Sequence, residues 1–253
     1  MSLYIATATW DDVPHLTEEN KLELMAGIPP YLRDAKIRGI PVLGAGLIYP
    51  LPEEEIRAPD TTPILETYPR GFSMDVGWNR TAVGWFAKNP QSGVVYIHDY
   101  YYQGERLPLV HADAIKSRGA WIPGVIDPRS DGRSQDDGQR LFETYIKCGL
   151  KLTKADNSVT TGITAVWQAL ATGKLKVFAG VQPFWDEIRM YRRKQDENET
   201  GKIVKKNDHF MDLVRYFVMS GIQRMVVGPG QSSVDSGWYE GWFKGGAGRS
   251  GWN

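Results

Sequence analysis

Three extended runs near the middle of the chain constrain its fold more than any other feature. Residues 71–76, 81–87 and 94–102 are rich in apolar and β-branched side chains, and turn residues such as those at 89–93 separate them. Strands that follow one another through short turns pair as an antiparallel meander. The sequence therefore predicts a three-stranded meander at the start of a sheet.

Strand and helix patterns alternate after these runs. This alternation is typical of proteins in which further strands extend the sheet and helices cover it. We therefore expect an α/β fold with a mixed central sheet, in which parallel strands join the antiparallel meander and helices lie on both faces. The predicted helices span residues 107–118, 136–148, 159–171, 183–190 and 208–220, and the predicted strands 121–126, 150–153 and 175–178.

The two ends of the chain differ from this central part. Residues 1–68 form an arm in our interpretation, with a strand at 4–10, a helix at 18–26 capped by Thr17, a helical turn at 33–38, an extended stretch at 42–49 and an irregular proline-rich connector at 50–69. Residues 69–227 are the main domain. Residues 228–253 are rich in Gly, Ser and Trp, and we expect a flexible tail there.

Composition excludes few functions. No apolar run approaches the roughly 20 residues that span a bilayer, so we expect no membrane association. The single cysteine, Cys148, excludes an intrachain disulfide and fits a reducing compartment. The 30 basic and 30 acidic residues give a net charge of zero, which neither supports nor excludes a nucleic acid partner.

Two aspartates occur where a predicted strand disfavours or ends at a carboxylate. Asp75 lies inside the first strand of the meander, where an ionised side chain needs a cation or hydrogen-bond donors. Asp127 follows the apolar strand at 121–126, and sites gather at the carboxyl ends of strands. Each has an ordinary alternative: a sheet-edge position for Asp75, and a turn into Pro128 for Asp127.

The start of the helix at 208–220 carries a third group of polar residues. Asp208 is placed to cap this helix, and His209 and Asp212 share a face one turn apart. The alternative for Asp212 is an ion pair with Arg215 at i+3, and His209 taken alone is more often a surface or packing residue.

Together the three aspartates suit phosphodiester hydrolysis. That reaction needs an activated water and stabilisation of charge on the attacking and leaving oxygens, which two divalent ions about 4 Å apart supply. Mg²⁺ and Mn²⁺ prefer oxygen ligands. We therefore expect Asp75, Asp127 and Asp212 to hold two Mg²⁺ or Mn²⁺ ions, with Asp208 and His209 as auxiliary ligands.

Several stretches resemble the nuclease domain of the large terminase subunits of tailed bacteriophages. The resemblance extends to the early segments, which look like the exit from the ATPase domain of those proteins. Its most specific part is the helix-start motif with both aspartates, His209 and Arg215. The matching stretches are residues 71–77, 81–83, 125–128 and 208–216, with 9–16 and 33–41 upstream.

This resemblance implies an RNase H-like endonuclease that cuts concatemeric double-stranded viral DNA during genome packaging, with little sequence specificity, in the cytoplasm of the host. It implies Asp75, Asp127 and Asp212 as catalytic metal ligands, and the portal or procapsid and the small terminase subunit as partners. The sequence has no phosphate-binding loop of the Gly-x-x-x-x-Gly-Lys-Ser/Thr type, so we expect no ATPase domain in this chain.

A charged segment precedes the last motif and is expected to form a hairpin at residues 192–206. A solvated hairpin explains it, but contacts to DNA phosphates suit nonspecific cutting. The tail tryptophans fit either a docking segment for the portal or a disordered terminus. The candidate DNA-binding residues are Arg192, Arg193, Lys194, Lys202, Lys205 and Lys206.

Two other functions remain open at this level. The first is another RNase H-like nuclease, such as a junction resolvase or a transposase core. The second is a non-catalytic module that docks on DNA or the portal and carries a degenerate site.

Overall fold

The computed structural model describes residues 9–13, 16–27, 37, 46–59, 61–131, 141–194, 202–204 and 208–229. The chain divides into two compact units, one made of residues 1–50 with 192–204 and the other of residues 51–191 with 205–253. All three candidate aspartates belong to the second unit. The expected arm ended at residue 68 rather than 50, and the division into arm, nuclease domain and tail stays a prediction.

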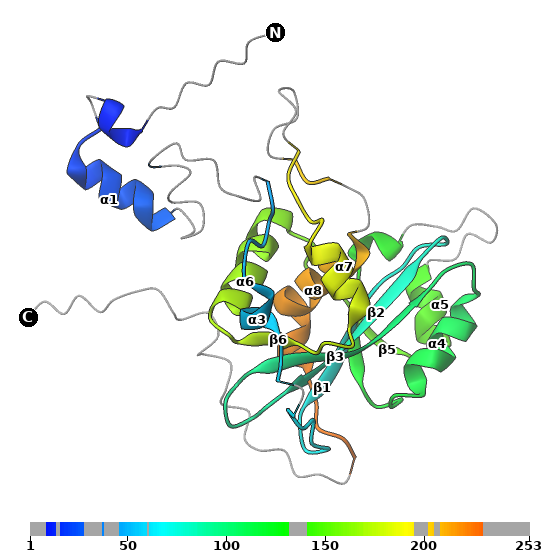
Figure 1. The fold of residues 1–253 in the computed structure, drawn as a ribbon. Coiled ribbons are helices and arrows are strands. Elements are labelled where there is room, and N and C mark those ends of the chain that lie inside the picture. The colour runs from blue at the N-terminus through cyan, green and yellow to red at the C-terminus, as the bar shows by residue number, and fades with distance from the viewer. Residues whose placement is uncertain are drawn as a thin grey trace, which may run out of the picture. The chain divides into compact units, whose positions relative to one another are not determined.

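A six-stranded mixed sheet forms the centre of the second unit, in the order β5-β4-β1-β2-β3-β6 (Figure 1). The first three strands form the predicted antiparallel meander, and β4, β5 and β6 pair in parallel with β1, β4 and β3. The expected mixed α/β sheet is therefore confirmed. The strands are β1 (Arg70–Asp75), β2 (Thr81–Lys88), β3 (Val95–Gln103), β4 (Pro123–Ile126), β5 (Lys151–Lys154) and β6 (Leu175–Val177).

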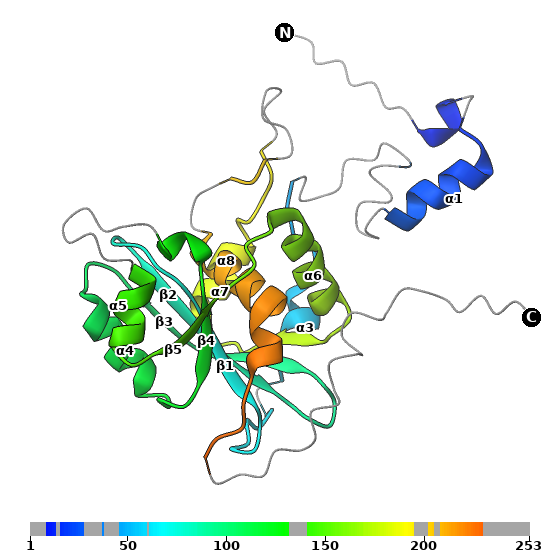
Figure 2. The same cartoon turned by 180° about the vertical axis from the view of Figure 1, so that it is seen from behind.

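Helices cover both faces of this sheet, as Figures 1 and 2 show from opposite sides. One face packs against α4 (Pro108–Lys116) and α5 (Leu141–Lys147), where Met74, Trp85 and Ile115 belong to one buried apolar cluster. The other face carries the remaining large helices. These are α6 (Val159–Ala171), α7 (Gln182–Ile188) and α8 (His209–Tyr216), the last continued by a π-helical turn, η3 (Phe217–Gly221), and a 3-10 turn, η4 (Ile222–Arg224).

Strand alternation decides which face each β1 residue meets. Met74 enters the cluster beneath α4 and α5, so its neighbour Asp75 points to the opposite face, which α8 covers. Close approach of α8 depends on Gly84 in β2. A Cβ atom on Gly84 would lie 2.9 Å from Leu213 Cδ1, so a larger residue would push α8 away from the strands that carry Asp75.

The proline-rich connector is more ordered than the sequence suggested. Residues 53–56 form a helical turn, α3 (Glu53–Ile56), and Arg57 makes an isolated parallel bridge with Val177 of β6. Ile56 is buried. The prediction of an irregular connector was wrong here because one apolar side chain, placed after three acidic residues, docks the turn on the main unit.

The smaller unit contains η1 (Trp10–Asp12) and α1 (Glu18–Gly27). The Oγ1 of Thr17 accepts a hydrogen bond from the Asn20 amide at 3.3 Å, which confirms the predicted cap. Trp10 begins a 3-10 turn rather than ending a strand, and residues 4–8 of that expected strand lie outside the described residues. None of the helices in the described part of the chain is long and apolar enough to cross a membrane.

The expected hairpin is present in its described residues. Arg193 pairs antiparallel with Ile203, and the Lys194 amide donates to the Lys202 carbonyl at 2.6 Å. The base of the hairpin also pairs with Leu47, which forms an antiparallel bridge with Arg192. Lys205, Lys206 and the tail from residue 230 onward, where we expected flexibility, lie outside the described residues.

Candidate active site

Asp75 and Asp127 end two neighbouring strands. β1 and β4 run parallel, with Met74 paired to Ile126, so the next residue on each chain is the aspartate. The carboxyl ends of parallel strands meet at one edge of the sheet. Both aspartates are buried, with 8% and 6% of their surface exposed. The sequence placed both residues correctly at strand ends.

Asp212 reaches the same region from α8. The helix lies on β1 and β2 and is buried along its whole length, so Asp212 is only 5% exposed. This burial differs from the expectation that Asp212 lies beside the apolar stripe, because neighbouring helices cover this side of α8 as well. The carboxylate therefore occupies an interior position where partners must compensate its lost hydration.

The electrostatics show that the three carboxylates surround common ground. Burial raises the pKa of the Asp75 carboxyl; the hydrogen bond from His209 opposes this rise, and the negative charges of Asp212 and Asp127 add to it. Burial also raises the pKa of the Tyr216 hydroxyl, and Asp212, Asp127 and Asp75 all raise it further. Tyr216 is a residue of α8 that the sequence did not single out as functional.

Each carboxylate has a basic partner. Nδ1 of His209 lies 2.7 Å from Asp75 Oδ2, and the Arg129 guanidinium donates through Nε to Asp127 Oδ2 at 2.9 Å. The Arg129 guanidinium also lies 3.4 Å from the Tyr216 hydroxyl, to which its Nη2 donates. Three cationic or ionisable donors therefore offset the carboxylates, and the hydrogen bond to Asp75 raises the pKa of His209.

The third partner is Arg215, so the ion pair considered as an ordinary explanation for Asp212 does exist. Arg215 Nη2 donates to Asp212 Oδ1 at 2.9 Å, and Nη1 donates to the Asn157 carbonyl at 2.7 Å. Gly162 of α6 makes room for this side chain, because a Cβ atom there would lie 2.5 Å from Arg215 Cγ. The pair is buried and links α8 to α6.

The N-terminus of α8 is capped by a residue that sequence reasoning missed. Asp208 holds the N-cap position, but its side chain makes no capping hydrogen bond. Glu187 of α7 takes that role, accepting the amides of Phe210 and Met211 at Oε2 at 2.7 and 3.3 Å. The prediction of Asp208 as a capping side chain was therefore wrong. A signal for Glu187 existed: it lies three residues after Phe184 on the apolar side of α7.

The donor chemistry suits a hard divalent cation, because carboxylate oxygens from three separate elements surround one hydroxyl. Within the described residues, however, no three His, Cys, Asp or Glu side chains are arranged as a ready-made group that could hold a metal ion. Basic partners hold the carboxylates instead. The residues fit the cation in type, and its binding requires some of these pairs to rearrange.

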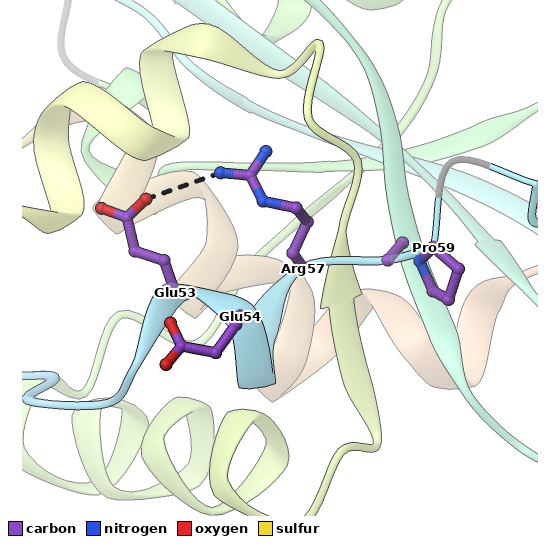
Figure 3. Close-up of a pocket in the computed structure, with 5 residues that line it drawn as sticks. Glu53, Glu54, Arg57 and Pro59 are labelled. Atoms are coloured by element: carbon purple, nitrogen blue, oxygen red, sulfur yellow. Dashed lines mark ion pairs between the residues drawn. The ribbon is translucent and has the colours of Figure 1, made fainter.

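Two other features lie outside this arrangement. Arg192, Arg193, Lys194 and Lys202 belong to the other compact unit, so the structure does not bring them to the carboxylates. A cavity of ≈ 500 Å³ next to α3 is lined by Glu53, Glu54, Arg57, Ala58 and Pro59, and Figure 3 shows the Arg57–Glu53 ion pair at its wall. None of the candidate site residues lines it.

Comparison with known proteins places this fold and site in context. A family model described as the terminase RNaseH-like domain matches residues 73–220. The large terminase subunit of Salmonella phage P22 is 30% identical over 238 residues, covering 88% of this chain and 45% of that protein. The corresponding subunit of Enterobacteria phage LP7 is 30% identical over 235 residues, covering 87% of this chain and 47% of that protein.

A solved structure gives the same result. The nuclease domain of the P22 large terminase superposes with a TM-score of 0.61 at 29% identity, covering 73% of this chain and 96% of that chain. The chain therefore spans less than half the length of the two curated relatives, and nearly all of the solved nuclease domain.

Proposed function

Because this chain belongs to the family of terminase RNase H-like domains, we propose that it is a metal-dependent endonuclease for double-stranded DNA. Its substrate would be concatemeric viral DNA, cut with little sequence preference during genome packaging in the host cytoplasm. The observation that carries the proposal is the convergence of Asp75, Asp127 and Asp212 from two strand ends and a helix on the buried Tyr216 hydroxyl.

In this proposal Asp75, Asp127 and Asp212 are the catalytic residues and hold two Mg²⁺ or Mn²⁺ ions. When bound, such ions activate a water and stabilise charge on the attacking and leaving oxygens of the phosphodiester. Asp208 and His209 are proposed as auxiliary ligands. The cation type follows from the carboxylate donors, since Mg²⁺ and Mn²⁺ favour oxygen ligands.

The chain's other residues orient these carboxylates. His209 fixes one Asp75 oxygen through the 2.7 Å contact and leaves the second oxygen facing the site. Arg215 fixes one oxygen of Asp212 in the same manner. Such outer partners commonly hold metal-binding carboxylates in place, and their loss weakens metal binding or activity by about 10- to 100-fold.

Substitution of the carboxylates tests the proposal. We expect Asp75→Ala, Asp127→Ala and Asp212→Ala each to slow Mn²⁺-dependent plasmid cleavage by about 100-fold or more, the usual effect of losing a central electrostatic contact in the transition state. Asp113→Ala is a matched control, because its exposed carboxylate pairs only with Lys116 on α4. Parent-like cleavage by all three site variants would refute the nuclease assignment.

Two further measurements separate the rival functions. A junction resolvase would cut a four-way junction much faster than linear duplex, whereas a packaging nuclease would not. A non-catalytic docking module would show no carboxylate-dependent uptake of Mn²⁺ in a calorimetric titration. Cleavage of linear duplex together with Asp127-dependent Mn²⁺ uptake supports the proposed function.

We also propose that the hairpin binds the DNA backbone. Arg192 and Lys202 are exposed on its two strands, and basic side chains that meet phosphates give affinity without sequence preference. Replacing Arg192, Arg193 and Lys194 with Ala should reduce the slope of log affinity against log salt by up to about three phosphate contacts. An unchanged slope excludes the role. Lys205 and Lys206 are proposed to extend the same surface.

The family relationship also indicates partners. We propose that the complete packaging assembly joins this domain to the portal or procapsid and to the small terminase subunit. A pull-down with purified portal and small subunit tests each contact separately.

A further inference from the structure

Glu187 is a buried carboxylate that the proposed chemistry leaves unused. It is 3% exposed, and burial raises its pKa to about 7 although three hydrogen bonds lower it. A carboxylate in such a position is unfavourable unless its oxygens have donors. Both oxygens do: the Tyr102 hydroxyl donates to Oε1 at 2.7 Å, and the Phe210 and Met211 amides donate to Oε2.

These contacts connect Glu187 to the start of α8. The first amides of a helix have no partner within the helix and need an acceptor from elsewhere. Asp208 makes no capping hydrogen bond here, so the acceptor comes from α7. The helix that begins at this point carries His209 as its first residue and Asp212 one turn later. The place where α8 starts therefore sets the positions of both site residues.

The second oxygen of Glu187 connects the same point to the sheet. Asp75 pairs with Ala82 across β1 and β2, and Ala82 pairs with Tyr102 across β2 and β3. Residues paired directly across antiparallel strands point to the same face. Asp75 and Tyr102 therefore belong to one row on the α8 side of the sheet, and Glu187 joins the Tyr102 end of that row to α8.

We infer that Glu187 is a positioning residue: its carboxylate ties the first turn of α8 to Tyr102, so that His209 and Asp212 are held against Asp75. The inference rests on the proposed function only for its consequence in metal binding. The tie itself consists of hydrogen bonds between described residues. Glu187 touches neither the three site carboxylates nor any position assigned to substrate.

The role depends on hydrogen bonding, which distinguishes it from simple packing. Gln at this position keeps an oxygen to accept the two amides, and its NH₂ group can donate to the Tyr102 hydroxyl oxygen. Leu keeps a similar volume and removes every acceptor. Glu187→Gln should therefore behave like the parent protein, and Glu187→Leu should not. A residue that only fills space would give the reverse order.

Hydrogen exchange and Mn²⁺ binding, measured on the full chain, test the inference. In Glu187→Leu, the Phe210 and Met211 amides should exchange about tenfold faster or more, the usual consequence of losing a hydrogen bond to a charged group. Mn²⁺ affinity should fall by about 10- to 100-fold, as for other outer-shell losses. Asp186→Asn is the matched control, since it alters an exposed carboxylate on the same helix.

Tyr102→Phe serves as a second variant if Glu187→Leu does not fold. It removes one hydroxyl from the tie, and it should speed exchange of the same two amides and weaken Mn²⁺ binding to a smaller extent. Unchanged amide exchange in the folded variant overturns the inference, and so does parent-like behaviour of Glu187→Leu. If the amides loosen while Asp75→Ala leaves Mn²⁺ binding unaltered, the positioning role stands and the metal site fails.

Discussion

The two Asp–Arg pairs of the candidate site differ in how far solvent reaches them. In the pair formed by Arg215 and Asp212, the side chains are 2% and 7% exposed. In the pair formed by Arg129 and Asp127, the carboxylate is 8% exposed but the guanidinium is 64% exposed. The nitrogen–oxygen distance is 2.9 Å in both. Equal geometry thus occurs in two different dielectric environments.

This difference indicates two kinds of ion pair within one site. Removing one partner of a buried pair leaves a charge without compensation, whereas an exposed partner is replaced by water. Arg215 also bonds the Asn157 carbonyl and fills space beside Gly162, so it is part of the fold. Arg129 lies on the short turn η2 (Pro128–Asp131) that follows β4 and is free to exchange Asp127 for another partner.

The largest effect that tests the comparison is loss of the buried cation. Arg215→Ala should lower the free energy of unfolding by about 3–5 kcal/mol, because Asp212 then remains buried without its counter-charge. Urea unfolding measures the change. Arg189→Ala is the control: it removes an Arg that makes two hydrogen bonds to Glu53 but is half exposed. If both variants lose the same stability, burial does not distinguish the pairs.

A second effect concerns the pH dependence of the buried side of the site. The pKa of Glu187 is raised from 4.5 to about 7 in the fold, so its stabilising contribution is complete below pH 4.5 and is lost as pH rises through 7. The shift corresponds to about 3 kcal/mol. The groups that face it are Tyr102, the Phe210 and Met211 amides, and His209.

Glu187→Gln removes this ionisation and keeps the acceptor oxygen. The free energy of unfolding of the variant should therefore fall less than that of the parent between about pH 5 and pH 8. Urea unfolding at several pH values gives the difference between the two proteins, in which the contributions of other groups cancel. Parallel curves would show that Glu187 does not titrate in this range.

Local patterns identified the exposed side of the site better than the buried side. Asp127 was predictable because strand ends follow from a short apolar run and the next polar residue, and the meander that fixes Asp75 consists of neighbouring segments. Glu187 was not identified, because its role depends on Tyr102 and α8, which are distant in sequence and meet only in the folded chain. The same reason explains the incorrect cap at Asp208: an N-cap position can be read from sequence, but a competing acceptor on α7 cannot.

The smallest expected effect on stability belongs to the exposed pair. Arg129→Ala should change the free energy of unfolding by less than about 1 kcal/mol, because water replaces the guanidinium. Mn²⁺ affinity should rise, since the cation no longer competes with Arg129 for Asp127. Lys116→Ala on α4 is the control, because it removes the same charge from the helix layer on the other face of the sheet. Weaker Mn²⁺ binding in Arg129→Ala alone would mean that Arg129 helps to hold the bound state, and the two pairs would then both belong to the working site.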